Sequence, residues 1–572
     1  MSTATQSREH SIPDDTLHPD SEVQSARGTV HAHAPRPLGR ARAIGLIATC
    51  ATATILNSAN NTAVAISLPT LGRDLGIPEY RLQWAISSYA LTSGGLLLFF
   101  GRVADLYGRK RSFLAGALCL AAFCLGCAFA KDEIQLDMLR GFQGMGAAAC
   151  IPAGLGILAH AFPPSRIRSV AFATFAAGAP IGAAIGSAIG GMLTQWTEQT
   201  WRSTFYFLTG MSFLCFVGAL VCFDPDLPSE EEDKRIDWLG AFLITAALVL
   251  IVFVLSDGTM ASDGWRTGYI IALLILGVIS LVLYVVWERF LERAQATGST
   301  SWWTPPPIMK VSLWARAKGK LAVIFVLAFL EYGSFIVFNF WITLYYQNYV
   351  ELSPVLTMIR LLPMSVTGLI CNALVALFVG RVPVVFLITF GTAMTAVANL
   401  LYGVINPAAP YWAFGFPAAI VSVFGADFVF ASGTLFVAKV CMPHEQSVGG
   451  AMFQTMTQLG SAIGLAITTI VFNTTLAKTS LRYGVVVNID QTNAPKSAQL
   501  VAYKDALWTG FAFGIFGTLL AVVFLRGAGI VGHRNDHAED DAYELSSDTK
   551  ISEVVGQQDK DERSFEMQLA SN

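Results

Sequence analysis

The feature that most constrains this chain is a series of long apolar runs, each of about 20 residues, that recurs along most of the sequence. A run of that length crosses the hydrocarbon layer of a membrane as one helix, and only helices or closed barrels can cross without stranding backbone polar groups. These runs are too long and too continuous for barrel strands. Apolar residues make up 54% of the chain and charged residues only 13%, about half the charged share of a soluble protein. The sequence therefore predicts an all-α polytopic membrane protein.

Fourteen runs are long enough to span the membrane. We expect the spans at 43–68, 80–100, 112–130, 136–159, 169–193, 203–223, 238–255, 269–290, 321–345, 355–379, 382–402, 412–441, 447–473 and 506–526. The long segment 474–505 is expected to be a loop, and the Asn473 sequon is expected at its edge, on the outer face.

The basic residues of alternate loops gather on one face of this arrangement, and the positive-inside rule makes that face cytoplasmic. They are Arg36, Arg40, Arg42, Arg102, Arg109, Lys110, Arg111, Arg166, Arg168, Arg316, Lys318 and Lys320. An even number of spans then places both termini in the cytoplasm. Residues 1–40 and the acidic segment 533–572 are polar and are expected to be disordered tails. Histidines of the first tail, among them His18, His31 and His33, could bind a metal, but a solvated low-complexity segment is the preferred interpretation.

Two short strings recur in matching order and indicate an internal repeat. FFGRV at 99–103 returns as FVGRV at 378–382, and GSAIG at 186–190 returns at 460–464. Each pair relates spans that are eight apart, so the two copies share one orientation. This predicts parallel six-helix halves at 43–223 and 321–526, with two further helices inserted at 238–290. Parallel halves around a central site are the architecture of alternating-access carriers. Chance recurrence of small residues is the alternative.

The loop between the second and third spans carries Gly101, Asp105, Gly108, Arg109 and Lys110. Glycine permits a tight turn, and Asp105 can accept from Arg109 or from a helix N-terminus in one conformation of a carrier. A merely basic stop-transfer loop would explain the cations but not the glycines and the aspartate. This loop resembles the signature of the major facilitator superfamily, and the likeness extends over about 43–526.

Two further motifs support the resemblance. The segment 139–146, which contains Arg140 and Gln143, is similar to the superfamily's second motif, and the resemblance implies that Arg140 assists proton transfer. The fifth span resembles the antiporter motif through Gly178, Pro180, Gly182, Gly186, Gly190 and Gly191. With 14 spans, the chain is most similar to drug:proton antiporter family 2, in particular to fungal transporters of the aminotriazole-resistance type. The resemblance implies export of a drug, toxin or secondary metabolite in exchange for protons.

The chain departs from these patterns in two places. The fifth-span motif has Gly186-Ser187 where the family has Gly-Pro, and the proline stands earlier, at Pro180. The first-span pattern normally carries an aspartate where this chain has Asn60, and an amide cannot carry a proton. We expect four amides to line the substrate cavity, with satisfied interhelical contacts as the alternative. They are Asn60, Asn61, Gln143 and Gln454.

Ionisable residues inside spans usually face water or a partner, because burying a charge in lipid is costly. Asp427 and Glu331 stand within spans 12 and 9 and are candidates for proton coupling together with Arg140. A static Arg140–Asp427 ion pair is the alternative. Arg360 stands near the outer end of span 10 and is expected to be a gate or an anchor. Five aromatics are candidates for lining an apolar cavity or facing lipid: Trp341, Tyr345, Tyr346, Phe428 and Phe430.

Several classes of function are set aside. A net charge of −3 gives no footprint for nucleic acid, and the nine cysteines lack metal-ligand spacing, so no metal or cofactor is expected. Because no loop assembles catalytic groups or a phosphate-binding motif, we do not expect an enzyme or an ATP-driven pump. A uniporter, a carrier of a small inorganic or nitrogenous solute, and a nontransporting sensor are the rivals. The expected partners are a small organic substrate, protons and the lipid bilayer. We expect a monomer in the plasma membrane, with the vacuolar membrane as the alternative.

Overall fold

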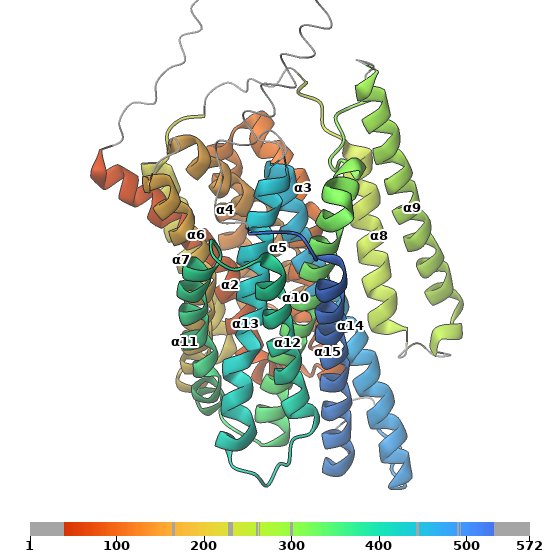
Figure 1. The fold of residues 1–572 in the computed structure, drawn as a ribbon. Coiled ribbons are helices and arrows are strands. Elements are labelled where there is room, and N and C mark those ends of the chain that lie inside the picture. Colours follow the sequence, from red (N-terminus) through yellow and green to blue (C-terminus); the bar gives the residue numbers. More distant parts are fainter. Residues whose placement is uncertain are drawn as a thin grey trace, which may run out of the picture.

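A computed structural model describes residues 39–162, 166–226, 233–258, 261, 264–297, 301, 303–441, 446–488, 491 and 493–530. The two predicted tails lie almost entirely outside these residues. The described chain is helical throughout (Figure 1). Its membrane-length helices are α2 (Arg40–Leu75), α3 (Trp84–Tyr107), α4 (Arg109–Ala128), α5 (Glu133–Ala161), α6 (Arg166–Trp196), α7 (Trp201–Cys222), α8 (Trp238–Asp257), α9 (Gly268–Ala296), α10 (Lys320–Leu344), α11 (Pro354–Phe378), α12 (Val384–Gly403), α13 (Tyr411–Val440), α14 (Gln446–Arg482) and α15 (Lys496–Phe524). Four short helical turns are η1 (Glu79–Arg81), η2 (Gly264–Arg266), η3 (Val311–Gly319) and η4 (Tyr345–Tyr349).

The 14 helices coincide with the 14 predicted spans, which confirms the predicted fold class. The segment 474–505 is the exception, because α14 continues to Arg482 and α15 already begins at Lys496. The prediction of a long loop was therefore wrong over most of its length. Asn473 lies inside α14 with 5% of its surface exposed, and its side-chain oxygen accepts from Gln491. The polar residues that suggested a loop are the ends of two helices that extend beyond the apolar runs.

Helices α2–α7 and α10–α15 use the same packing scheme. Helix α2 packs on α6 and α7, as α10 packs on α14 and α15. Helix α4 packs on α5 and α7, as α12 packs on α13 and α15, while α3 packs on α5 as α11 packs on α13. We call these two sets of six helices the N half and the C half. Helices α8 and α9 pair with each other at the edge of the bundle, where α8 contacts α3 and α14 (Figure 1).

The repeated GSAIG strings occupy matching places in this scheme. In the N half, a Cβ on Gly186 would lie 2.7 Å from the Cα of Ala59 in α2. In the C half, a Cβ on Gly464 would lie 2.9 Å from the Cα of Gly333 in α10. Each string thus lets the fifth helix of its half approach the first helix closely, as small residues do in membrane helix pairs.

The glycines of the predicted antiporter motif form one face of α6. Gly178, Gly182, Gly186 and Gly190 follow one another at four-residue intervals, and each meets α2. Gly191 instead faces α11, where a Cβ would lie 3.1 Å from the Cβ of Met358. Pro180 stands within the unbroken α6 and lies close to Gly368 of α11. The glycine face of α6 therefore packs closely against α2, while Pro180 and Gly191 contact α11 of the C half.

Candidate functional site

The loop between α3 and α4 lies at one end of the bundle, which we call the basic end. It is the upper end in Figure 1. Arg109 donates to the Asp105 carboxylate at 3.1 Å and to the carbonyl of Gly156 in α5 at 3.1 Å. Gly101 faces Pro152, also in α5. The predicted Asp105–Arg109 pair is present, and it joins α3, α4 and α5 within the N half.

A second carboxylate, Asp226, completes this loop. Its two oxygens accept from the backbone N–H groups of Lys110 at 2.7 Å and Arg111 at 3.0 Å, the first-turn donors of α4. The Lys110 ammonium in turn donates to the carbonyl of Phe223 at the end of α7. Gly108 has a φ of +113°, and a Cβ there would lie 2.8 Å from the Cβ of Asp226. The glycine is thus required by both the backbone conformation and the approach of Asp226.

A buried polar network lies in the N half, between α2, α3 and α5. The Arg140 guanidinium donates to the carbonyl of Ala85 at 2.7 Å and to the side-chain oxygen of Gln143 at 2.8 Å. Gln143 donates to the side-chain oxygen of Asn60 at 2.5 Å. Arg140, Gln143 and Asn60 are fully buried. The structure thus brings together three residues that the sequence had singled out separately.

The ring of Tyr89 closes this network from one side. The guanidinium carbon of Arg140 lies 4.7 Å from the ring centroid, within the range of a cation–π interaction. The Tyr89 hydroxyl donates to Asn57 at 2.7 Å. Asn57 and Asn61 are part-exposed, and Asn61 donates to the carbonyl of Asn57. Gln454, the fourth amide, stands on α14 of the C half, so it is separate from this network.

Glu331 is a fully buried carboxyl group in α10 of the C half. A Cβ on Gly425 of α13 would touch its carboxyl group, so the two helices meet there. The hydroxyl of Thr395 in α12 lies beside it but donates to the carbonyl of Ser422 at 3.0 Å. Neither oxygen of Glu331 has a hydrogen-bond partner among the described residues. Since an ionised carboxylate without donors is very costly to bury, this environment suits the neutral acid.

Asp427 is the second acid in the C half and lies on α13. It lies beside Asn372 of α11, whose amide donates to the carbonyl of Gly368, and its Oδ2 has no partner among the described residues. A Cβ on Gly368 would lie 3.5 Å from that Oδ2 and 3.3 Å from the Cβ of Pro180 in α6. Because Gly368 lies close to both Asp427 and Pro180 of α6, the part-exposed Asp427 stands near the junction of the two halves. The ion pairs among the described residues do not join Asp427 to Arg140, so the alternative of a static pair between them was wrong.

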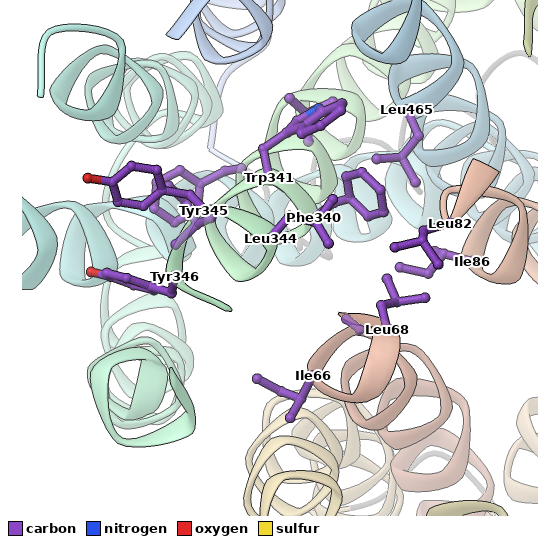
Figure 2. Packing of buried hydrophobic residues seen from close by; sticks show 14 of the residues in the cluster. Ile66, Leu68, Leu82, Ile86, Phe340, Trp341, Leu344, Tyr345, Tyr346 and Leu465 are labelled. Atoms are coloured by element: carbon purple, nitrogen blue, oxygen red, sulfur yellow. The ribbon is translucent and has the colours of Figure 1, made fainter. Parts of the chain in front are cut away.

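The end opposite the basic end is closed by one apolar cluster that spans both halves. It holds Leu68, Leu82 and Ile86 of the N half together with Phe340 and Leu465 of the C half, all buried. Figure 2 shows Phe340 pointing from α10 toward Leu82 and Ile86. Trp341 stacks on Phe472 with centroids 4.5 Å apart, and Tyr345 and Tyr346 belong to the same cluster. We call this cluster the seal.

Hydrogen bonds between the halves reinforce the seal. Gln347 donates to the carbonyl of Ile66 at 2.8 Å, and Thr469 donates to the side-chain oxygen of Gln83 at 2.9 Å. The Tyr503 hydroxyl is hydrogen-bonded to Glu79. Toward the basic end the buried clusters are separate for each half, although the part-buried Leu98 of α3 packs against the C-half cluster. The two halves are therefore joined most extensively at the end opposite the basic loop.

Arg360 lies at the edge of the seal. Its guanidinium carbon is 5.1 Å from the ring centroid of Tyr346 and 5.4 Å from that of Tyr411. The Tyr411 hydroxyl donates to the backbone carbonyl of Arg360 at 2.7 Å. The remaining aromatic candidates lie elsewhere, with Phe428 packed against Phe424 and Phe430 against Phe453. Trp341, Tyr345 and Tyr346 thus close the bundle rather than line an open cavity in this conformation.

Sequence reasoning missed Asn57, Tyr89, Asn372 and Asp226 as members of these sites. Asn57 stands one helical turn before the amide pair Asn60–Asn61, and this spacing was a usable signal. Asp226 follows α7 in a polar segment with no pattern of its own. Its role depends on the meeting of α4 and α7, which the sequence does not specify.

The sequence was compared with known proteins. The family model described as Major Facilitator Superfamily matches residues 50–256. The puromycin resistance protein of Streptomyces alboniger is 30% identical over 414 residues, which cover 71% of this chain and 77% of that protein. Efflux pump terG of Aspergillus terreus is 25% identical over 530 residues, covering 90% and 93%. The aminotriazole resistance protein of Saccharomyces cerevisiae is 24% identical over 497 residues, covering 85% of each chain, and this confirms the expected likeness.

Two further matches bear on substrate and fold. The low affinity ammonium transporter of Saccharomyces cerevisiae is 27% identical over 399 residues, covering 68% of this chain and 73% of that protein. Among solved structures, the POT family transporter PepTSo superposes with a TM-score of 0.59 at 15% identity, covering 86% of this chain and 99% of that chain. At this identity the structural likeness concerns the fold alone.

Proposed function

Because this chain belongs to the Major Facilitator Superfamily, we propose that it exports a small organic molecule by alternating access in exchange for protons. The chain is a multi-pass membrane transporter, and its relatives include an efflux pump and two resistance proteins. Export explains resistance directly, because a toxin that is pumped out no longer reaches its target. The finer assignment, exchange with protons, rests on the C half of this chain.

The observation that carries the coupling is the pair of acids Glu331 and Asp427. Both lie inside the C half, and neither forms an ion pair among the described residues. A carboxyl group without a cation can gain and lose a proton when its access to water changes. One pH unit supplies about 1.4 kcal/mol per proton, and a potential of 100 mV adds about 2.3 kcal/mol per charge. Asp427, near the junction of the halves, is suited to exchange its proton as the halves move.

The seal supports alternating access. One end of the bundle is closed by residues of both halves. A carrier in this conformation would therefore exchange its substrate from the basic end. The positive-inside rule identifies the basic end as cytoplasmic. Opening the seal would require the residues around Phe340 and Leu82 to separate, with Arg360 moving at their edge. The basic loop, tied within the N half by Asp105, Arg109 and Asp226, would move as a unit.

The coupling is tested in proteoliposomes that hold a pH-sensitive dye. The probe is chosen first among compounds, puromycin included, to which yeast expressing the chain becomes resistant. Adding the probe against an imposed pH gradient is expected to drive proton flux in the wild type. Asp427→Asn and Glu331→Gln are each expected to lower that flux at least tenfold, because an amide cannot carry a proton. Unchanged flux in both variants refutes the assignment of both acids.

The matched control is Asp505→Asn. Asp505 lies in α15 of the same half and accepts from the Thr475 hydroxyl at 2.9 Å, near the end opposite the basic loop. Its substitution removes a carboxylate from a membrane-length helix without touching either candidate. The control is expected to retain the flux, and a loss equal to that of Asp427→Asn would attribute the effect to folding or insertion.

A uniporter or a carrier of a small nitrogenous solute is the second candidate. The fully buried Asn60, which leaves the first helix without an acid at that depth, favours it, as does the likeness to an ammonium transporter. Collapse of the pH gradient distinguishes the two mechanisms. Export that continues at the same rate without the gradient would support the uniporter and refute the antiporter.

A further inference from the structure

We propose that the Arg140 network binds the anionic group of the transported molecule, so that the substrates are organic anions. The proposal rests on the function proposed above and names the substrate class of that same transporter. The ligand chemistry is a carboxylate, or another compact oxyanion, attached to an apolar body.

The first observation is that Arg140 carries a buried charge without a counterion. None of its surface is exposed, and the ion pairs among the described residues do not include it. Its Nη2 is buried and has no hydrogen-bond partner within the part of the chain that the structure describes. Asp137, one turn earlier on α5, acts on Arg140 electrostatically. A buried cation that lacks a paired anion is costly, and an incoming anion would relieve that cost.

The second observation is that the side chains that contact Arg140 by a hydrogen bond or through a ring face are neutral. Gln143, Asn60 and Tyr89 surround it, and the nearest ionisable thiols, Cys124 and Cys127, are buried. The side-chain oxygen of Gln143 accepts from Arg140, and its amide nitrogen donates to Asn60 and Cys124. None of these side chains supplies the negative charge that the guanidinium lacks. Guanidinium groups bind carboxylates through two parallel N–H donors, and the free Nη2 is one such donor.

The third observation concerns access to the network. Ala85, whose carbonyl holds Arg140, belongs to the seal, as does Leu136 of α5. Arg140 therefore lies directly beneath the seal. Asn57 and Asn61 are part-exposed, and Asn57 connects to the network through the Tyr89 hydroxyl. Separation of the seal, or displacement of Tyr89 by a ligand, would uncover the guanidinium.

A purely structural role for Arg140 would leave part of this arrangement unexplained. The bond to Ala85 ties α5 to α3, and a neutral donor such as glutamine could make it without burying a charge. The C half, where Glu331 and Asp427 lie, would carry the protons, while the N half would carry the anion. Substrate and protons would thus use different halves of the molecule.

The test uses three probes that share one naphthalene ring: 1-naphthoate, neutral 1-naphthamide and cationic 1-naphthylmethylammonium. Binding to the purified full-length protein in nanodiscs is measured at equilibrium through the naphthalene fluorescence, with no pH gradient. The wild type is expected to bind naphthoate at least tenfold more tightly than either other probe. Equal affinity for the three probes, preference for the cation, or no binding of naphthoate would overturn the proposal.

Two variants localise the site. Asn60→Asp places a carboxylate beside Gln143 in the same network. It is expected to lower the affinity for naphthoate relative to naphthamide at least tenfold, and to make the cationic probe the preferred one. The matched control is Thr52→Asp, which adds the same carboxylate to α2 about two turns before Asn60. Thr52 donates to the carbonyl of Ala48 in its own helix, outside the network, so this variant should keep the preference for the anion. Arg140→Gln should lose the preference, and Arg140→Lys should retain part of it. A preference for naphthoate that persists unchanged in Asn60→Asp would refute the site even if Arg140→Gln fails to fold.

This outcome is separable from the test of proton exchange. If Asp427→Asn and Glu331→Gln leave proton flux unchanged while naphthoate binding still depends on position 60, the antiport fails and the anion site stands. If those variants abolish flux while the three probes bind equally, the antiport stands and the anion site fails.

Discussion

The contact between α10 and α14 makes a sharp prediction at Gly460. A Cβ at this position would lie 2.7 Å from the carbonyl carbon of Phe329 and 2.9 Å from its Cα, and closer still to its carbonyl oxygen. These are backbone atoms, so no side chain can rotate to make room. Gly460→Ala must therefore push α10 and α14 apart by roughly 1–2 Å, to bring these atoms to ordinary contact at about 3.5 to 4.0 Å.

The magnitude follows from two opposing effects. Overpacking a tight contact costs typically 1–3 kcal/mol, whereas alanine in a helix gains up to about 1 kcal/mol over glycine. Gly450, in the same helix, isolates the second effect, because a Cβ there would meet nothing within 4 Å. We expect Gly450→Ala to be as stable as the wild type or more stable. Gly460→Ala should have a free energy of unfolding about 2 kcal/mol lower than that of Gly450→Ala. For a cooperative unit of about 200 residues this corresponds to roughly 4–8 °C in the unfolding temperature.

The buried cysteines of the protein can report its thermal unfolding. Seven of its nine cysteines are buried, so a thiol-reactive fluorophore labels them as the fold opens on heating. Gly460→Ala should also reduce transport, because Glu331 follows Phe329 by two residues on the displaced helix. An unfolding temperature for Gly460→Ala equal to or above that of Gly450→Ala would refute the argument that this glycine sets the distance between α10 and α14.

Three further predictions concern the two ends of the bundle. Asp226→Ala removes the acceptor for the first-turn donors of α4 and should cost about 1 kcal/mol in the same assay, whereas the exposed Asp224→Ala, a partner of Arg42, should cost far less. Gln347→Leu removes a hydrogen bond across the seal and should speed labelling of a cysteine introduced at Leu82 by a membrane-impermeant maleimide about two- to tenfold; unchanged labelling would contradict the role of that bond. Burial raises the pKa of Asp237, which precedes α8, so its contribution to stability is present at low pH and is lost as the pH rises above about 4. Asp237→Asn should therefore flatten the dependence of stability on pH, and an unchanged slope would count against the assignment.

The fold was largely predictable from the sequence, for a reason specific to lipid. Each membrane-length helix must be apolar along its own length and must form its own backbone hydrogen bonds. The position of each of the 14 spans could therefore be predicted separately from the local sequence. The main error concerned 474–505, where α14 and α15 extend past the apolar runs as polar helices. Outside the hydrocarbon, a polar segment can be helix or loop, and hydropathy does not distinguish them.

The candidate site was only partly predictable. The basic loop is local in sequence, and the sequence already offered Arg109 as one of two possible partners of Asp105. The partners of buried polar residues were not, and Arg140 illustrates why. The sequence offered Asp427 as its counterion, whereas the structure places Arg140 against Gln143 and Tyr89 in the N half and Asp427 against Asn372 in the C half. The roles of these residues in transport stay predictions.

The sequence by itself determined the number of helices, the repeat of the two halves and the glycine strings that let helices approach, because each is set by local composition and periodicity. Only the tertiary structure decided which end of the bundle is sealed and which polar groups meet. Those choices depend on the depth and rotation of each helix relative to its neighbours. A shift of one residue turns a helix by about 100° and changes every partner, while the hydropathy of the run stays the same.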